Sequence, residues 1–216
     1  MNAVTRYIPA LKYNWLTKLY DPVIHLTMPE RKLKEALINQ MNILPFYKVL
    51  DFGCGSLTLS LMAKQQHPQS EFYGVDVDGK ILSMADKKMK EAKLSINIQQ
   101  YDGKTLPYPV NYFDRVMSSL VFHHLTLRQK YSALEEIHRV LKPSGEVHIA
   151  DFGKPSNGLQ RIGFYSVQLL DGFETTGDNV RGLLPQVVKE SGFVIEETRH
   201  FETIVGTVRL IKGTKK

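Results

Sequence analysis

Side chains and turns that can bind a ligand follow three segments of the chain that are typical of buried strands. The first segment, residues 48–52, runs into a loop with the sequence DFGCGSL at residues 51–57. Its glycines, Gly53 and Gly55, let the backbone turn sharply and approach a ligand with no Cβ in the way. Because many tight turns need such a pair, the loop alone leaves a ligand site and a plain turn equally open.

An acid ends each of the next two expected strands. A carboxylate at Asp76 can accept hydrogen bonds from both ribose hydroxyls of an adenosine, and the other explanation, a helix cap, suits Asp78 better. Asp102 can accept a hydrogen bond from an adenine amino group, and Gly103 leaves room for the ring. Taken alone, that pair is equally well explained as a surface turn. Together the three strand ends predict a site for an adenosine-containing cofactor.

The charges of the loop favour S-adenosylmethionine (SAM) over NAD as this cofactor. A dinucleotide site has a third glycine at the position that Thr58 holds here, where a helix N-terminus receives a pyrophosphate. The carboxylate of Asp51 would repel a pyrophosphate, but it suits the α-ammonium group of a methionine moiety, directly or through water. An NAD-linked oxidoreductase is therefore the disfavoured alternative.

Strand-like and helix-like segments alternate along most of the 216 residues, which predicts an α/β protein with a doubly wound parallel sheet and helices on both faces. The expected strands are residues 48–52, 71–75, 95–101, 113–120, 146–151, 193–202 and 204–212. The expected helices after residue 45 are residues 56–66, 78–92, 127–141, 158–171 and 179–191, with a turn at residues 142–145. Ligands of such sheets bind beyond the carboxyl ends of the strands.

Residues 46–151 resemble the class I SAM-dependent methyltransferases, in particular the group that includes the ubiquinone/menaquinone-biosynthesis C-methyltransferases. The resemblance rests on the order and spacing of VLDFGCGS, GVDVD, YDG, FDRVMSSLVFHHL and RVLKPSGEVHIADF. It implies a Rossmann-like sheet of seven strands, mostly parallel with an antiparallel last strand. The rest of the chain, including DGFETTGDN at residues 171–179, resembles the group more loosely.

The resemblance also implies a role for each cofactor-binding position. These positions are Asp51, Gly53, Cys54, Gly55, Ser56, Asp76, Val77, Asp102, Gly103 and Ser119. Asp51 and the glycine loop would hold the methionine part, and Asp76 the ribose. Val77, Asp102 and Gly103 would frame the adenine, and Ser119 would lie beside the sulfonium. Leu57 stands where the family usually has a third glycine, which could alter the loop or narrow the pocket, and it leaves a noncatalytic SAM-binding protein as an alternative.

Catalytic candidates follow the fourth and fifth expected strands. Methyl transfer needs donor and acceptor in line, and it needs a base only when the acceptor carries a proton that must leave. His123 and His124 are the candidate bases, and Asp151 could orient a substrate hydroxyl or amine. Helix packing for the histidines and a capping role for Asp151 are the structural alternatives. No cluster of histidines, cysteines or carboxylates has metal-ligand spacing, so we expect no essential metal.

Aromatic and apolar residues in two further segments suggest the kind of acceptor. They are Tyr13, Trp15 and Tyr20, followed by Asp21, in the N-terminal helices, and Phe164, Tyr165, Leu169, Leu170 and Phe173 before the last helix. In related enzymes these segments form a lid, which implies a small hydrophobic, aromatic or lipid-like acceptor, although each residue can equally belong to the core. We expect a helical lid segment at residues 1–45 and the methyltransferase domain at residues 46–216, within one globular unit.

Charge and composition bound the remaining alternatives. The net charge of +6, from 28 basic and 22 acidic residues, makes an RNA or protein methyltransferase the second candidate. The lysines are spread along the chain, however, and no Asn-Pro-Pro-Tyr-like stretch follows the fourth strand, which disfavours nucleic acid. Cys54 is the one cysteine, and no apolar run approaches the roughly 18 residues of a membrane span. We therefore expect a cytoplasmic protein without a transmembrane segment or signal peptide.

Overall fold

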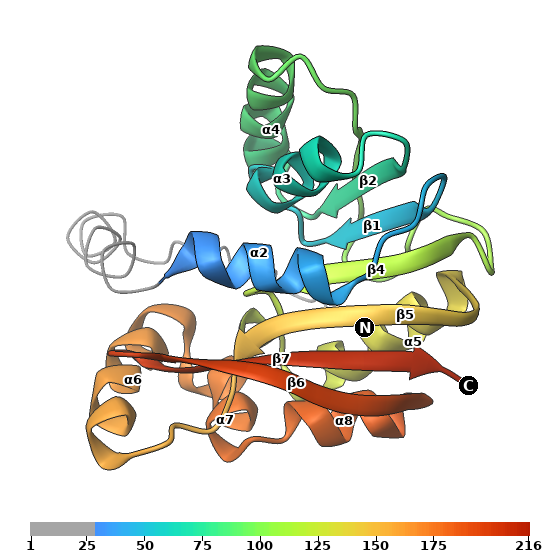
Figure 1. Cartoon of the computed structure of the whole chain (residues 1–216). Helices are drawn as coiled ribbons and strands as arrows, with labels where there is room; N and C mark the ends of the chain where they lie inside the picture. Colours follow the sequence, from blue (N-terminus) through green and yellow to red (C-terminus); the bar gives the residue numbers. More distant parts are fainter. Residues whose placement is uncertain (1–28) are drawn as a thin grey trace, which may run out of the picture.

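A seven-stranded sheet forms the centre of the computed structural model, which describes residues 29–216 (Figure 1). The strand order is β3-β2-β1-β4-β5-β7-β6. Neighbours from β3 to β5 are parallel, and β7 is antiparallel to both β5 and β6. The strands are β1 (Lys48–Phe52), β2 (Glu71–Asp76), β3 (Asn97–Gln100), β4 (Phe113–Ser119), β5 (Leu141–Phe152), β6 (Phe193–Thr203) and β7 (Gly206–Lys215). This topology confirms the predicted doubly wound, mostly parallel sheet with an antiparallel last strand.

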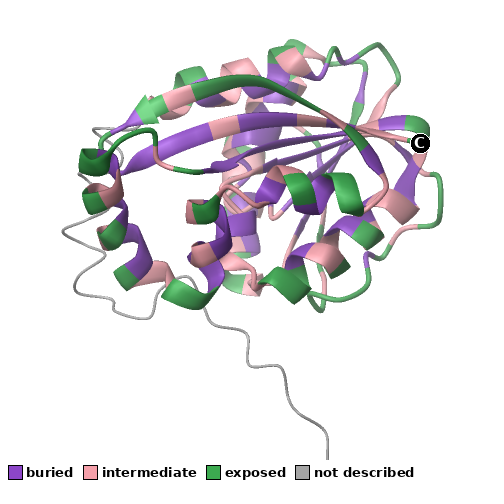
Figure 2. Ribbon diagram, turned by 90° about the horizontal axis from the view of Figure 1, so that it is seen from below, coloured by how far each residue is buried: buried purple, intermediate pink, exposed green. Residues whose placement is uncertain are grey.

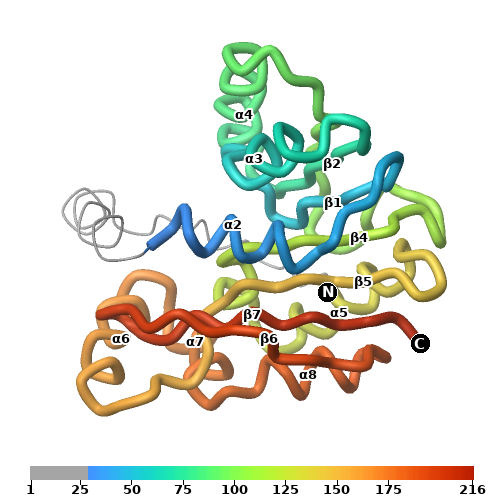
Figure 3. The backbone as a smooth tube through the Cα atoms, in the orientation of Figure 1, coloured from blue at the N-terminus to red at the C-terminus, as the bar shows by residue number. Residues whose placement is uncertain are grey.

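Helices cover both faces of the sheet, as Figures 1 and 3 show. Within the described residues they are α2 (Glu30–Gln40), α3 (Thr58–Gln66), α4 (Gly79–Glu91), α5 (Leu127–Val140), α6 (Gly158–Asp171), α7 (Phe173–Arg181) and α8 (Leu184–Glu190), with a short 3-10 turn, η1 (Phe122–His124). α2, α3 and α4 pack on one face, and α5 and α8 pack on the other. α6 and α7 lie at the end of the sheet toward which the parallel strands point (Figure 1).

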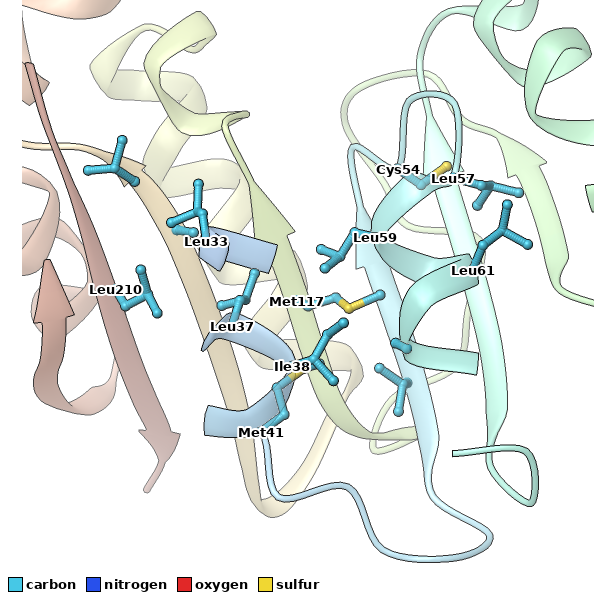
Figure 4. Packing of buried hydrophobic residues seen from close by; sticks show 14 of the residues in the cluster. Leu33, Leu37, Ile38, Met41, Cys54, Leu57, Leu59, Leu61, Met117 and Leu210 are labelled. Carbon is cyan, nitrogen blue, oxygen red and sulfur yellow. The ribbon is translucent and has the colours of Figure 1, made fainter. Parts of the chain in front are cut away.

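Alternation along the strands divides the core into two layers. In β1, Val49 packs on the side of α2 to α4, whereas Leu50 and Phe52 pack on the side of α5 and α8. Figure 2 shows the central strands buried over most of their length. In Figure 4 the apolar face of α2, with Leu37, lies over the sheet beside Met117 of β4. Each leucine buried in this way contributes about 1.5–3 kcal/mol.

The predicted lid segments are only partly described. Residues 1–28, which include Tyr13, Trp15, Tyr20 and Asp21, lie outside the described residues. In the later segment, Phe164 is fully buried, so it belongs to the core, whereas Tyr165, Leu169 and Phe173 are exposed. The lid function and the boundary at residue 45 stay predictions. None of the described helices is long and apolar enough to cross a membrane.

One predicted helix, residues 179–191, is wrong in its extent. Asn179 belongs to α7, which begins at Phe173, and α8 covers only Leu184–Glu190. Gly182 separates them with a left-handed backbone (φ 75°), and Pro185 lies in the first turn of α8. A left-handed glycine ends a helix and a proline starts one, so these two residues together impose the break.

The fifth strand also begins earlier than predicted. Leu141 already pairs with Phe113, and regular pairing resumes where Glu146 lies opposite Arg115. The predicted turn at residues 142–145 is therefore an irregularity within β5, and Ser144 in it has a positive φ of 60°. The strand pattern alone does not show that pairing starts before such an interruption.

Leu57, which replaces the usual third glycine, takes the backbone conformation that a glycine would take. It is the N-cap of α3, with φ 63° and ψ 15°, and its side chain is fully buried. The side chain points into the core toward Gly74 of β2, where a Cβ would lie 3.1 Å from Leu57 Cδ2. The left-handed backbone costs about 1–2 kcal/mol for a residue with a side chain, and burial of the leucine offsets this cost.

We expect Leu57→Gly to destabilise the protein less than Leu57→Ala. Both variants lose the buried leucine side chain, and for Leu57→Ala we expect the free energy of unfolding to fall by about 2–5 kcal/mol. Glycine also relieves the strain of the left-handed backbone, so for Leu57→Gly we expect a smaller fall of about 1–3 kcal/mol. The free energies of unfolding from denaturant titrations test the order. A smaller loss for the alanine variant would contradict this account of the loop.

Candidate active site

The carboxyl ends of the parallel strands bring most of the predicted site residues to one edge of the sheet (Figure 1). The glycine loop follows β1, Asp76 ends β2, and Ser119 ends β4 opposite Ala150 of β5. The cofactor-binding positions and the catalytic candidates therefore occupy neighbouring parts of this edge, the first around β1 to β3 and the second around β4 and β5.

The glycine loop and the acid of β2 form one hydrogen-bonded unit. The Gly55 N–H donates to Asp76 Oδ2 over 2.9 Å, and the Asp78 N–H donates to Asp76 Oδ1 over 3.0 Å. Gly53 has φ 72°, and a Cβ there would lie 2.5 Å from a methyl group of Val121, in the loop after β4. Asp78 caps α4, as predicted, by accepting a hydrogen bond from the Lys80 N–H. Asp76 is thus held by backbone on both sides while its carboxylate stays at the strand end.

The predicted adenine side is a narrow space between two residues. A Cβ on Gly103 would lie 3.5 Å from Val77 Cγ1, so these two residues face each other across the ends of β2 and β3. Asp102 is exposed, and its Oδ1 accepts the N–H groups of Lys104 and Thr105 at 2.8 and 3.0 Å. The Thr105 and Lys104 N–H groups lower the pKa of Asp102, which keeps the carboxylate ionised.

Asp51 and Cys54 lie behind the loop. Asp51 is 2% exposed, and the Ser60 hydroxyl donates to its Oδ2 over 2.6 Å. Burial raises the pKa of Asp51 to about 7, although the hydrogen bond from Ser60 and the charge of Lys34 oppose the rise. Burial also raises the pKa of the Cys54 thiol, so this side chain is protonated and unreactive. Ser56 lies in the loop itself, with its hydroxyl 3.4 Å from that of Thr58.

His123 lies between two carboxylates. Its Nδ1 is 2.8 Å from Asp151 Oδ1, and because a carboxylate only accepts, the ring N–H is the donor. Its Nε2 is 3.7 Å from Asp171 Oδ2. Burial lowers the pKa of His123, but the charge and hydrogen bond of Asp151 and the charge of Asp171 outweigh it, so the pKa is raised. The imidazole is therefore oriented by one carboxylate and well suited to hold a second proton.

His124 completes a group that we call the histidine cluster, made of His123, His124 and Asp171. The two imidazole rings are 4.0 Å apart, and His124 Nδ1 lies 3.6 Å from Asp171 Oδ1. Burial and the neighbouring His123 lower the pKa of His124 to about 3, so this ring is neutral near pH 7. Burial raises the pKa of Asp171, against the charge of His123.

Asp151 lies at the end of β5, as predicted, and its carboxylate is buried and fully hydrogen-bonded. It is 1% exposed, and its Oδ2 accepts the N–H groups of Val121 and Phe122 at 3.0 and 2.7 Å. Its Oδ1 accepts the Phe152 N–H at 2.7 Å in addition to the His123 ring. Burial raises the pKa of Asp151, but His123 and the backbone donors outweigh this, so the net shift is downward. Both oxygens of Asp151 are thus bonded to His123 and to backbone N–H groups, and a role in orienting an acceptor stays a prediction.

Three residues of this region were missed from the sequence. Asp171 joins the histidine cluster from the end of α6, and Asn179 of α7 donates to the Phe152 carbonyl over 2.7 Å. Lys130 of α5 is fully buried, and it donates to the Thr175 carbonyl over 2.8 Å beside Asp178 at 3.5 Å. The signal that could have found two of them is the polar run DGFETTGDN at residues 171–179, which follows an apolar helix.

The chain is similar to known methyltransferases in sequence. Residues 49–145 match the family described as a methyltransferase domain. Over 95% of this chain and 88% of the relative, it is 30% identical to the ubiquinone/menaquinone biosynthesis C-methyltransferase UbiE of Cupriavidus metallidurans. The chain belongs to the class I SAM-dependent methyltransferases. The UbiE protein of Nitrosospira multiformis is 27% identical over the same shares of the two chains.

Solved structures agree with the fold of the methyltransferase. The YcgJ protein of Bacillus subtilis has a TM-score of 0.70 at 16% identity, covering 86% of this chain and 99% of that one. A SAM-dependent methyltransferase of Methanosarcina mazei has a TM-score of 0.68 at 16% identity, covering 83% and 96%. Family membership makes SAM the cofactor and sets aside the NAD-linked and noncatalytic alternatives.

The residues of the methyltransferase fit SAM. At Gly53 and Gly55 the backbone turns with positive φ, and neither residue adds a side chain to the loop. Asp76 presents a carboxylate where β2 ends, and the space between Val77 and Gly103 has the width of a van der Waals contact to a Cβ. A side chain at position 103 would close against Val77, so the glycine keeps this strand end open.

We expect Asp51→Asn to stabilise the ligand-free methyltransferase more as the pH rises. The pKa of Asp51 is raised from 3.8 to about 7. Between these values the folded protein holds a proton that the unfolded chain has lost, so wild-type stability falls as the pH rises through this window, by up to about 4 kcal/mol. Asparagine removes that loss and can still accept the Ser60 hydrogen bond.

Thermal unfolding at about pH 5 and pH 8 measures this effect. The stabilisation by Asp51→Asn should be larger at the higher pH. Asp86→Asn, which changes an exposed carboxylate on α4, is the matched control and should show no such growth. An equal gain from Asp51→Asn at both pH values would show that Asp51 ionises normally in the folded protein.

Proposed function

We propose that the enzyme methylates a ring carbon of a small, hydrophobic, hydroxylated aromatic acceptor, of the phenol or hydroquinone class. The observation that carries this proposal is the pairing of His123 with Asp151, which orients an imidazole at the edge of the sheet where β4 and β5 end. The name of the relatives, ubiquinone/menaquinone biosynthesis C-methyltransferase, supports a carbon acceptor in a quinone-like ring. Exposed Tyr165, Leu169 and Phe173, close to Asp171 in the chain, support an apolar acceptor.

The cofactor would be held by the residues around β1 to β3. Asp76 would accept the ribose hydroxyls, and Val77 with Gly103 would enclose the adenine, whose amino group Asp102 would accept. The backbone of residues 53–56 would follow the methionine moiety, with Asp51 behind it, and Ser119 would lie toward the acceptor side. When bound, SAM supplies an electrophilic methyl group on its sulfonium.

The histidine cluster would activate the acceptor. His123 Nε2 takes the proton of the ring hydroxyl, and Asp151 stabilises the imidazolium that forms, in the manner of other Asp–His pairs. The resulting oxyanion raises electron density at the neighbouring ring carbon. This carbon would bond to the methyl carbon as the bond from that carbon to the sulfonium sulfur breaks, which leaves S-adenosylhomocysteine. The ring carbon then loses its hydrogen as a proton to solvent, and the ring becomes aromatic again. His124, neutral near pH 7, leaves the charge on His123.

The second candidate, an RNA or protein methyltransferase, has less support. Two lysines of α4 that contribute to the net charge form ion pairs within that helix. Lys90 lies 2.5 Å from Asp86, and Lys87 lies 4.0 Å from Glu91. Both lysines are exposed on one helix. Such a helix face is typical of solvated surfaces, not of a polyanion groove.

We expect Asp76→Ala to weaken SAM binding at least tenfold, because it removes charge-assisted hydrogen bonds worth about 1.5–3 kcal/mol. Calorimetry measures the affinity. Asp78→Ala is the matched control: it removes the cap of α4 two residues away, so it should lower stability with little change in SAM affinity. In thermal-shift assays, SAM should stabilise the wild-type protein and NAD should not. Unchanged SAM affinity in Asp76→Ala would remove the ribose assignment.

We expect His123→Ala to lower turnover by about 10²–10⁴-fold while SAM affinity is retained, because only proton transfer is lost. Turnover is measured with labelled SAM and a panel of phenols and hydroquinones with and without an alkyl tail, and NMR of the product locates the methyl group. His200→Ala, an exposed histidine on β6, is the control and should keep full turnover. Methylation only at oxygen, or transfer only to RNA or protein fractions, would overturn the proposed acceptor class.

A further inference from the structure

We propose that His123, His124 and Asp171 form a binding site for a first-row divalent transition-metal ion, with Zn²⁺ as its representative. Two imidazole nitrogens and a carboxylate are the ligands that such ions take in proteins, leaving a fourth position for water or substrate. The three residues come from η1 and from the carboxyl end of α6. One ligand atom from each lies within 4.8 Å of the others.

The distances are close to those of a tetrahedral site. Bonds of about 2.0–2.1 Å place neighbouring ligands about 3.3–3.4 Å apart. The cluster has 3.7 Å between His123 Nε2 and Asp171 Oδ2, and 3.6 Å between His124 Nδ1 and Asp171 Oδ1. Each histidine would therefore need to approach Asp171 by only a few tenths of an ångström, and all three ligand atoms already lie within 4.8 Å of one another.

Asp151 orients the first ligand as second-layer carboxylates do in metal sites. A metal-bound histidine usually donates its other ring N–H to a carboxylate or carbonyl, which fixes the tautomer and directs the free lone pair at the ion. His123 Nδ1 is 2.8 Å from Asp151 Oδ1, so its Nε2 lone pair faces Asp171. Asp151 is itself held by the N–H groups of Val121 and Phe122.

Charge and access also suit a cation. Asp151 and Asp171 place two carboxylates around His123, and the buried Lys130 lies 3.5 Å from another acid, Asp178. A divalent ion would balance the pair of carboxylates. The His124 side chain is 34% exposed, so one side of the cluster is reachable from solvent.

The use of the ion in catalysis rests on the proposed function. An acceptor hydroxyl at the fourth position would lose its proton to solvent and bind as an oxyanion, and the ion would take over from His123 the task of stabilising that charge. Binding of the ion itself does not depend on the acceptor. The earlier expectation of no essential metal relied on spacing along the chain, and Asp171 is too far from the histidines in sequence for spacing to show it.

Metal titration of untagged, chelator-treated protein tests the site. Calorimetry with Zn²⁺ and absorption spectroscopy with Co²⁺ should show one ion per chain, with the visible bands of tetrahedral Co²⁺. Asp171→Asn and His124→Ala should each weaken Zn²⁺ binding at least tenfold, and His200→Ala should leave it unchanged. Retained SAM affinity in each variant shows that the fold is intact.

Each outcome bears on one proposal. Absence of stoichiometric binding, or equal loss of binding in His200→Ala, would overturn the metal site and leave His123 as the base of the proposed function. Stoichiometric binding without methylation of any phenol or hydroquinone would leave the metal site standing and overturn the proposed acceptor. Turnover that falls on chelation and returns with Zn²⁺ or Co²⁺ would join the two.

Discussion

The buried carboxylate of Asp151 holds together the elements around the histidine cluster. It joins β5 to the turn after β4 through the N–H groups of Val121 and Phe122, to η1 through the His123 ring, and approaches α7 through the Asn179 amide at 3.4 Å. An ion this deep costs several kcal/mol unless donors surround it. Burial raises the pKa of Asp151, but His123 and the backbone donors hold it below its usual range. Removal of this charge would weaken all of these contacts together rather than a single one.

Val121 links the glycine loop to Asp151. A Cβ on Gly53 would lie within 2.5 Å of the Val121 side chain, and the Val121 N–H donates to Asp151. On the other side of the loop, the Gly55 N–H donates to Asp76. A continuous path of short contacts therefore runs from the acid of β2, through the glycine loop, to the histidine cluster. The glycine at position 53 is needed for this close approach as much as for its positive φ.

The sequence predicted the elements that obey local rules. Strand alternation, the glycine loop and the Asp78 cap all depend on neighbouring residues, and the structure has them as expected. Contacts between residues that are distant in the sequence could not be predicted in this way. Asp171 reaches the histidines only because α6 returns to the edge of the sheet, and Asp151 is saturated by donors from another strand end. The roles of the cofactor-binding residues and of the histidines stay predictions.

Leu57 makes the glycine loop dependent on the neighbouring strand. Its side chain and that of Cys54 fill the space beside Gly74, where a Cβ would lie 3.1 Å from Leu57 Cδ2 and 2.9 Å from Cys54 Sγ. A glycine at position 57 would vacate part of this space, and a larger residue at position 74 would need it. Position 74 is therefore epistatic to the loop. Along an evolutionary path, the order in which these positions change decides which intermediates fold.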